Sequence, residues 1–332
     1  MDNKETTIDD VELVAKLNST VAELKSEIGK VIIGQEEVID NLLTGLLARG
    51  HCLLVGVPGL AKTLLIKTLA EVLDLKFNRI QFTPDLMPSD ITGTEIIEED
   101  QVTKKRSFRF IQGPIFANVI LADEINRTPP KTQSALLEAM QEHKITAAGQ
   151  TYDLGDPFFV LATQNPIEQE GTYPLPEAQL DRFMFNLWLG YPSYEDEINI
   201  IKSTTSDYQP NLKKTVSTSQ LVEFQDLVRR VPVADNVIEY AVKFVNATRP
   251  NTKNSKEFVN EWVNWGAGPR ASQYLILSAK AKSIMAGRYT PNIDDVKSSL
   301  IPVLRHRIIP NFNAEAEGIN SVEIIKKIEE SI

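Results

Sequence analysis

The sequence has one cysteine, no long apolar run and no excess of positive charge. Cys52 therefore has no partner for an internal disulfide. No window approaches the ~18 consecutive apolar residues that suggest a membrane span. The acidic and polar start, Met1 to Glu5, is unlike a secretory signal, so we expect a cytoplasmic protein. Asp and Glu number 45 against 35 Lys and Arg, and the net charge of −10 argues against broad nonspecific DNA binding.

The remaining composition is that of a globular protein. Hydrophobic residues make up 42% and charged residues 24% of the 332 positions. A chain of this length exceeds the usual range of a single domain, so we expect two domains that each bury a core.

A glycine-rich loop at residues 56–63, Gly-Val-Pro-Gly-Leu-Ala-Lys-Thr, lies between an apolar run and a helical run. Backbone N–H groups of such a loop converge on a phosphate at the helix N-terminus. Lys62 would then contact the β- and γ-phosphates and Thr63 would ligate Mg²⁺. An ordinary turn is the alternative, because the strict pattern has glycine where this chain has Ala61. A helix N-terminus repels cations, however, so a lysine that is only exposed to solvent is unfavourable there.

The predicted nucleotide-binding residues of the loop are Gly56, Val57, Pro58, Gly59, Leu60, Ala61, Lys62, Thr63 and Leu64.

Two amphipathic helices are expected before this loop, over residues 9–29 and 35–49, because their apolar residues recur with helical spacing. The short connection between them contains Ile33 and Gly34, which could lie against an adenine ring. A simple turn between helices explains the same residues equally well.

Paired carboxylates follow the apolar run at residues 119–122. Four consecutive apolar residues suit a parallel strand that is buried on both faces, and α/β sheets keep their sites at the carboxyl ends of strands. Phosphoryl transfer needs one carboxylate near Mg²⁺ and one group that orients or deprotonates the attacking water. We assign Asp123 to the metal and Glu124 to the water. The alternative is a solvated acidic loop.

Two further polar residues carry weaker signals. Asn165 follows the strand expected at residues 158–163, where an amide could hold the attacking water or a γ-phosphate oxygen, although Asn-Pro also opens turns. Arg270 sits at a predicted helix start, where a cation is misplaced unless an anion lies opposite. A loosely placed surface arginine is the alternative for Arg270.

The remaining pattern divides the chain near Gly190. Strands are expected at residues 76–82 and 183–189, with loops over 83–93 and 164–179. An insertion over 94–110 should project from the domain, and residues 144–154 resemble a β-hairpin. After Gly190 the pattern is helical, over 194–203, 217–230, 235–248, 269–286, 293–305 and 322–328. We therefore predict an α/β nucleotide-binding core at residues 1–190, the N-terminal helix included, and a small all-α lid domain at residues 191–332.

Taken in order, these motifs resemble those of the AAA+ ATPases, and their amino-acid sequences are most similar to those of the MoxR family. The matching stretches are the loop at 56–63, Leu-Ala-Asp-Glu-Ile-Asn-Arg at 121–127, Gln-Ser-Ala-Leu-Leu-Glu-Ala-Met at 133–140, Ala-Thr-Gln-Asn-Pro at 162–166 and Leu-Pro-Glu-Ala-Gln-Leu-Asp-Arg-Phe at 175–183. The resemblance covers the chain from about Ile32 to Arg307. Ala61 belongs to this family's form of the loop.

The resemblance implies an AAA+ P-loop core with a five-stranded parallel sheet, a helix-2 insertion within 83–110, a hairpin before the sensor strand at 144–154, and a helical lid. It gives Asn165 the position of sensor 1 and Arg270 that of sensor 2. Arg182 resembles an arginine finger, which would contact the ATP bound to a neighbouring subunit. Arg127 matches the family's Asn-Arg pair without an assigned role.

The resemblance also implies ATP and Mg²⁺ as cofactors and a homo-oligomer, expected to be a hexameric ring. MoxR-like proteins remodel or mature other proteins, often beside partners with von Willebrand factor A domains.

Four other functions were considered. The ATPase subunit of a metal chelatase shares the insertions. A DNA-linked motor related to the MCM helicases needs basic hairpins, for which Lys104, Lys105 and Arg106 offer one cluster, whereas residues 144–154 are nearly uncharged. A nucleotide-binding scaffold without hydrolysis is disfavoured by the presence of Glu124 and Arg182. A signalling GTPase is disfavoured because the chain has no Asn-Lys-x-Asp motif.

Overall fold

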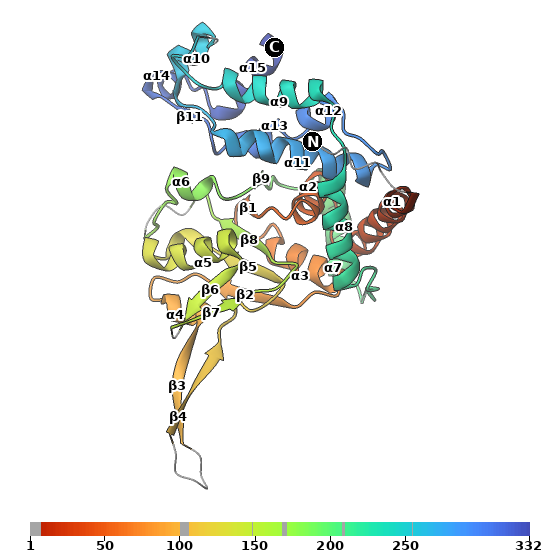
Figure 1. Ribbon diagram of the computed structural model, residues 1–332, viewed down its shortest axis with the longest axis vertical. Coiled ribbons are helices and arrows are strands. Elements are labelled where there is room, and N and C mark those ends of the chain that lie inside the picture. The colour runs from red at the N-terminus through yellow and green to blue at the C-terminus, as the bar shows by residue number, and fades with distance from the viewer. Residues whose placement is uncertain (1–7, 100–105, 148, 168–170, 208–209, 254) are drawn as a thin grey trace.

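A five-stranded parallel sheet forms the centre of the computed structural model (Figure 1). The structure describes residues 8–99, 106–147, 149–167, 171–207, 210–253 and 255–332. The strands are β1 (Cys52–Val55), β2 (Phe77–Gln81), β5 (Val119–Asp123), β8 (Phe159–Gln164) and β9 (Phe185–Trp188), in the order β2-β5-β8-β1-β9. The predicted five-stranded parallel sheet is therefore confirmed.

The sheet is covered on both faces, because its central strands are apolar throughout. Alternate residues of β1 belong to different apolar clusters: Leu54 packs with the N-terminal helices and the lid, and Leu53 packs with the opposite face. The parallel register brings all the strand ends to one edge, with Val55 beside Gln164, and Gln81 beside Asp123. Residues that follow these strands must therefore lie close together.

The core helices are α3 (Lys62–Val72), α4 (Pro88–Thr92), α5 (Pro130–Glu142) and α6 (Glu177–Leu180), with a 3₁₀ turn η1 (Ile125–Arg127) after β5. The helices α4 and α6 lie within segments predicted as loops. Each has only four or five residues and begins at or just after a proline, which favours the first turn of a helix. Such short helices leave no periodic pattern in the sequence.

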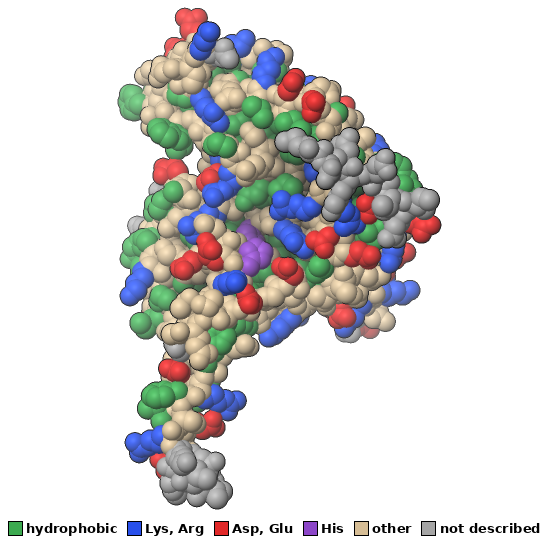
Figure 2. Space-filling model, in the orientation of Figure 1, with side chains coloured by type: hydrophobic (Ala, Val, Ile, Leu, Met, Phe, Trp, Pro, Cys, Tyr) green, Lys and Arg blue, Asp and Glu red, His purple; other side chains and the backbone are tan. Residues whose placement is uncertain are grey.

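Two antiparallel hairpins extend the core. One pairs β3 (Gly93–Glu99) with β4 (Arg106–Gln112) and projects far from the sheet, as predicted for the insertion (Figure 1). Figure 2 shows hydrophobic and charged side chains along its length. Arg106 pairs with Glu99 at 3.2 Å, while Lys104 and Lys105 of the basic cluster lie outside the described residues. The second hairpin, β6 (Lys144–Ala147) with β7 (Gln150–Asp153), confirms the hairpin predicted at 144–154.

An aromatic cluster joins the bases of the two hairpins. The ring of Tyr152 in β7 stacks on Phe110 of β4 with centroids 4.5 Å apart, and Phe116 meets Phe110 and Tyr152 edge-on, each at 6.1 Å. Aromatic pairs at these distances add to the stability gained by burying the rings. The two insertions therefore share one packed base.

The lid is helical, as predicted, with one small addition. Its helices are α7 (Tyr194–Thr204), α8 (Thr218–Arg230), α9 (Asp235–Ala247), α10 (Glu257–Trp262), α11 (Pro269–Met285), α12 (Ile293–Lys297), α13 (Leu300–Leu304), α14 (Phe312–Ala316) and α15 (Ser321–Ser331). The addition is a short antiparallel pair, β10 (Val263–Trp265) with β11 (Ile309–Pro310). None of the described helices has both the length and the apolar content that crossing a bilayer requires.

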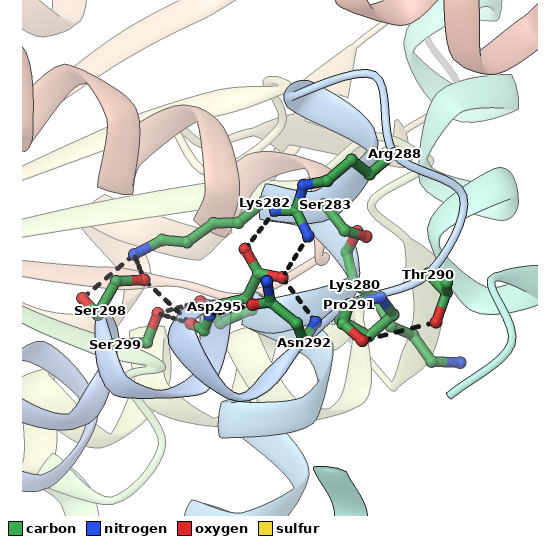
Figure 3. A network of polar contacts seen from close by, with 11 residues as sticks. Lys280, Lys282, Ser283, Arg288, Thr290, Pro291, Asn292, Asp295, Ser298 and Ser299 are labelled. Carbon is green, nitrogen blue, oxygen red and sulfur yellow. Dashed lines mark hydrogen bonds and ion pairs between the residues drawn. The ribbon is translucent and has the colours of Figure 1, made fainter. Parts of the chain in front are cut away.

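The helix predicted at 293–305 is broken into α12 and α13. Asp295 accepts hydrogen bonds from Arg288 at 2.8 and 2.5 Å, and its backbone N–H donates to the capping Asn292 at 3.0 Å (Figure 3). This network fixes the start of α12. Pro302 has no N–H to donate, so it fits the first turn of the new helix α13 rather than the interior of a continuous one.

The N-terminal helices connect the core with the lid. The helix α1 (Ile8–Gly29) packs on α3 of the core and on α8 and α11 of the lid, and α2 (Glu36–Leu47) packs on β9, α8 and α11. One apolar cluster runs through all of these elements. The division at Gly190 therefore stays a prediction.

The buried His51 predicts a loss of stability in acid. Its Nδ1 accepts from the Val160 N–H at 3.1 Å and its Nε2 lies 3.0 Å from the Met140 carbonyl, so the neutral ring satisfies both partners. Burial lowers the pKa of His51 to about 4, whereas an unfolded chain has a value near 6.5. The unfolded state therefore binds a proton at a pH at which the folded state does not, and the stability of the fold decreases as the pH drops below 6.5.

Between pH 7 and pH 5 we expect His51 to lower the free energy of unfolding by roughly 2 kcal/mol. Urea unfolding at both pH values should show a correspondingly weaker pH dependence for His51→Gln; an unchanged dependence would contradict this account.

Candidate functional site

A cavity of ≈ 460 Å³ opens where the strand ends meet. It is lined by residues of the glycine-rich loop and α3 and by residues at or just after the ends of β5 and β8: Pro58, Gly59, Leu60, Ala61, Lys62, Thr63, Leu64, Asp123, Glu124, Thr163 and Asn165. The structure thus brings together the predicted phosphate loop, the paired carboxylates and the asparagine.

The loop holds its lysine through its own carbonyl groups. The Nζ of Lys62 donates to the backbone oxygen of Val57 at 3.0 Å and to that of Gly56. Burial lowers the pKa of Lys62, and the nearby Asp123 and Glu124 oppose this shift. An anion in the cavity would meet both the ammonium group and the N-terminus of α3.

Ala61 is the position at which the loop departs from the strict pattern. Its φ of 55° lies in the left-handed region, which glycine adopts freely and a side chain disfavours by about 1–2 kcal/mol. At this position the loop therefore holds an alanine in a backbone conformation that favours glycine.

Asp123 is fixed by two neighbours. The hydroxyl of Thr163 in β8 donates to its Oδ1 at 2.6 Å, and Arg79 in β2 pairs with its Oδ2 at 2.7 Å. The Asp123 side chain is only 11% exposed, so these contacts compensate for the loss of hydration. Sequence reasoning missed both partners. Thr163 could have been found from its place beside the polar end of a neighbouring strand.

Glu124 is held by a different set of groups. Its Oε2 accepts from Gln81 of β2 at 2.8 Å and pairs with Arg127 at 3.1 Å. Its backbone N–H donates to the hydroxyl of Thr163 at 2.9 Å, so Thr163 contacts both acidic residues. The structure thereby gives Arg127, which had no assigned role, a contact with the carboxylate that we assign to the water.

Asn165 forms the turn considered for it and also lines the cavity. Its Oδ1 accepts from the backbone N–H of Ile167 at 3.1 Å, which forms the expected turn. Its side chain is buried and still lines the cavity, so its amide N–H₂ is placed to donate to a group bound there.

A smaller apolar cavity of ≈ 150 Å³ adjoins the first and shares Gly59, Leu60, Ala61 and Leu64 with it. Ile33, Leu189, Pro192 and Ile200 are among its other lining residues. Gly34 forms the adjacent turn with φ of 70°, where a Cβ would lie 2.9 Å from Asp196. Ile33 thus lines this cavity, whereas Gly34 forms the turn beside it, and their contact with a base stays a prediction.

Arg182 and Arg270 lie apart from these cavities. Arg270 is near the start of α11, and the anion opposite it is Asp181, whose Oδ2 is 2.7 Å from its Nη1. Arg182 is the next residue along the chain, in the segment before β9. The backbone of Arg182 therefore lies close to Arg270, and neither arginine lines the phosphate cavity of its own chain.

The comparisons with known proteins agree with this geometry. The sequence model of the ATPase family associated with various cellular activities (AAA) matches residues 51–185, and the model of the AAA lid domain matches residues 256–328. The chain is 43% identical to Chaperone MoxR1 of Mycobacterium tuberculosis over 306 residues, which cover 92% of this chain and 80% of that protein. This chain belongs to the MoxR family of AAA+ ATPases. Protein MoxR of Paracoccus denitrificans is 28% identical over 309 residues, 87% of this chain and 89% of that protein.

The MoxR-family fold is also found in a solved structure. A protein of Cytophaga hutchinsonii, described as a candidate ATPase, superimposes with a TM-score of 0.90 at 43% identity, and the match covers 97% of this chain and 96% of that one. The AAA match contains the residues of the polar cavity and Arg182, whereas Arg270 lies in the lid match. These findings support the ATPase identity, and the role of each side chain rests on the geometry described above.

Proposed function

We propose that this MoxR-family protein hydrolyses ATP with Mg²⁺ at the junctions of a ring and uses the energy to remodel a protein client. The observation that carries the proposal is the pair of adjoining cavities. The polar one combines Lys62, Thr63 and two carboxylates, which suits a triphosphate, and the apolar one suits an adenine ring. Hydroxyl and carboxylate oxygens are ligands that Mg²⁺ prefers, so Thr63 and Asp123 fit that ion.

Each cavity residue has a defined task in this proposal. Lys62 exchanges the carbonyl groups of its own loop for phosphate oxygens. Thr163 and Arg79 hold Asp123 in place, so that it can take part in binding Mg²⁺, which neutralises developing phosphate charge when bound. Glu124, released from Gln81 and Arg127, orients the attacking water and accepts its proton. Asn165 donates to the water or to a γ-phosphate oxygen.

The separate position of the two arginines supports a ring. Arg182 and Arg270 do not line the phosphate cavity of their own chain, so we assign them to the ATP of a neighbouring subunit. An interface that joins two different surfaces of identical chains closes into a ring when its rotation permits. A hexamer is the ring that the family resemblance suggests.

The projecting hairpin supports contact with a client. Ile97 of β3 and Phe108 of β4 face each other across the hairpin and are 63% and 71% exposed. Contiguous exposed apolar side chains are a feature of surfaces that bind proteins, and we assign this pair to such a surface. The β6–β7 hairpin offers little to nucleic acid, because its Lys144 is paired with Asp153 at 3.4 Å. A partner with a von Willebrand factor A domain and a cytoplasmic location remain our predictions.

Nucleotide binding tests the proposal at the phosphate loop. Lys62→Ala removes charged hydrogen bonds to phosphate and should weaken ATP binding at least roughly tenfold. The affinity can be measured with a fluorescent ATP analogue, beside phosphate release with Mg²⁺ and with chelator. Lys67→Ala, an exposed lysine one turn further along α3, is the matched control and should bind normally. Normal ATP binding by Lys62→Ala, or hydrolysis that is indifferent to chelator, would refute the proposed site.

A further inference from the structure

One buried arginine of the lid contacts the segment that carries Arg182 through several hydrogen bonds. The side chain of Arg307, just after α13, is 2% exposed. Its Nε donates to Asp181 Oδ1 at 2.7 Å, and its Nη2 donates at 2.8 Å to the backbone oxygens of Asp181 and of Phe183. A buried guanidinium is tolerated only when it is paired and hydrogen-bonded, so this contact is strongly specified.

The two residues before Arg307 contact the same segment. His306 lies with its Nε2 3.1 Å from the Phe183 carbonyl, and the guanidinium of Arg305 stacks over the Trp188 ring at 4.7 Å. Three consecutive lid residues, 305–307, thus bind the stretch 181–188 that leads into and forms β9. We call them the lid clasp.

Asp181 connects this clasp with Arg270. One carboxylate oxygen receives Arg307 and the other receives Arg270, each at 2.7 Å. The hydroxyl of Tyr274, one turn after Arg270 in α11, donates to the backbone oxygen of Arg182 at 3.3 Å. The backbone of the Arg182 segment and the side chain of Arg270 are therefore fixed relative to each other through a single carboxylate and its neighbours.

A cleft opens beside the cluster. Asp181 and Arg307 line a cleft of ≈ 490 Å³ between α6 and the lid, together with Trp265 and Gly266. Trp265 is 69% exposed at the rim. This cleft shares no lining residue with the two nucleotide cavities. A group from a second subunit can reach this side of the molecule without entering the chain's own ATP site.

We propose that Asp181 is a positioning residue that holds Arg182 and Arg270 as one preformed pair for the ATP of the neighbouring subunit. This inference rests on the proposed function, because it needs ATP at a junction between subunits. Asp181 does not touch the nucleotide. It ties the lid to the Arg182 segment, so that both arginines reach the neighbouring site together.

A mixing experiment separates action on the neighbour from action within one chain. The Asp181→Asn protein should have turnover about 10- to 100-fold below wild type with little change in KM, because misplacing a reacting group by about 1 Å can have an effect of that size. The Glu124→Gln protein should be inactive for a different reason, since its own site lacks the base. Co-expressed at a 1:1 ratio with different tags, the two variants should regain about a quarter of the wild-type turnover, because half of the sites keep Glu124 and half of those meet an intact Asp181.

Controls distinguish positioning from general stability of the lid. Asp226→Asn removes another ion pair between core and lid, with Arg49 at 2.9 Å, and should leave turnover unchanged. Asp181→Glu keeps the charge and should restore part of the activity even if Asp181→Asn folds poorly. Each variant is examined as the full chain, with nucleotide affinity and assembly size measured alongside.

Three results would overturn the inference. They are wild-type turnover of Asp181→Asn, loss of assembly in that variant, and failure of the mixture to exceed its two parents while the wild type hydrolyses ATP. If the wild type itself does not hydrolyse ATP, or if Glu124→Gln remains active, the proposed function fails instead.

Discussion

Arg182→Ala is expected to lower ATP turnover by about 10³- to 10⁵-fold, the range by which an arginine supplied from a neighbour accelerates phosphoryl transfer. The chain's own phosphate cavity does not include Arg182, so ATP binding by the same subunit should change little. The turnover number is measured by phosphate release at saturating ATP, and the affinity by a fluorescent analogue.

A matched arginine tests whether this effect is specific to the position. Arg109→Ala removes an exposed guanidinium on the β3–β4 hairpin, where it pairs with Glu98 at 3.4 Å. Basal turnover should stay at the wild-type level in this control. If Arg182→Ala keeps normal turnover in the assembled protein, Arg182 is not the arginine finger.

Glu124→Gln should lower turnover by about 10²- to 10⁴-fold, the usual contribution of a general base. Glutamine keeps the size of the side chain and can still contact Gln81 and Arg127, so the fold and ATP binding should persist. Bound ATP should then outlast many wild-type turnovers, which can be followed by filter binding with labelled nucleotide.

The outcome of this substitution also bears on the division of roles between the two acids. Glu142→Gln, at the exposed end of α5, serves as the control with the same chemical change. Loss of ATP binding by Glu124→Gln would assign this residue to binding rather than to the water. Such a variant, held with ATP bound, is also the form with which to capture the client.

The parts of the site that the sequence predicted are those set by local chemistry and by the sheet. The phosphate loop, Asp123, Glu124 and Asn165 each follow an apolar strand, and parallel strands bring their ends to one edge. The contacts that sequence reasoning missed join distant elements. Arg79 reaches Asp123 across a strand pairing, and its place in an alternating strand gives no sign of that contact.

The same reasoning explains what was missed in the lid. Arg307 lies 126 positions from Asp181, and a lone buried arginine after a short helix has no pattern of its own. The sequence predicted α12 and α13 as one helix because the apolar spacing continues across the break between them. Only Asp295 and Pro302 indicate that break. By contrast, the charge argument at Arg270 asked for an anion opposite, and the carboxylate of Asp181 lies there, while the role of Arg270 toward ATP stays a prediction.

The groups that restrain the two acids also set the local electric field. Lys62, Arg79 and Arg127 surround Asp123 and Glu124, so three cations face two carboxylates in a chain whose net charge is −10. A polyanion approaching the molecule is repelled by the whole and attracted by this one edge of the sheet, and such local fields govern the rate of encounter. Added salt therefore acts on ATP capture in two opposing ways, by weakening the overall repulsion and by screening the attraction at the cavity.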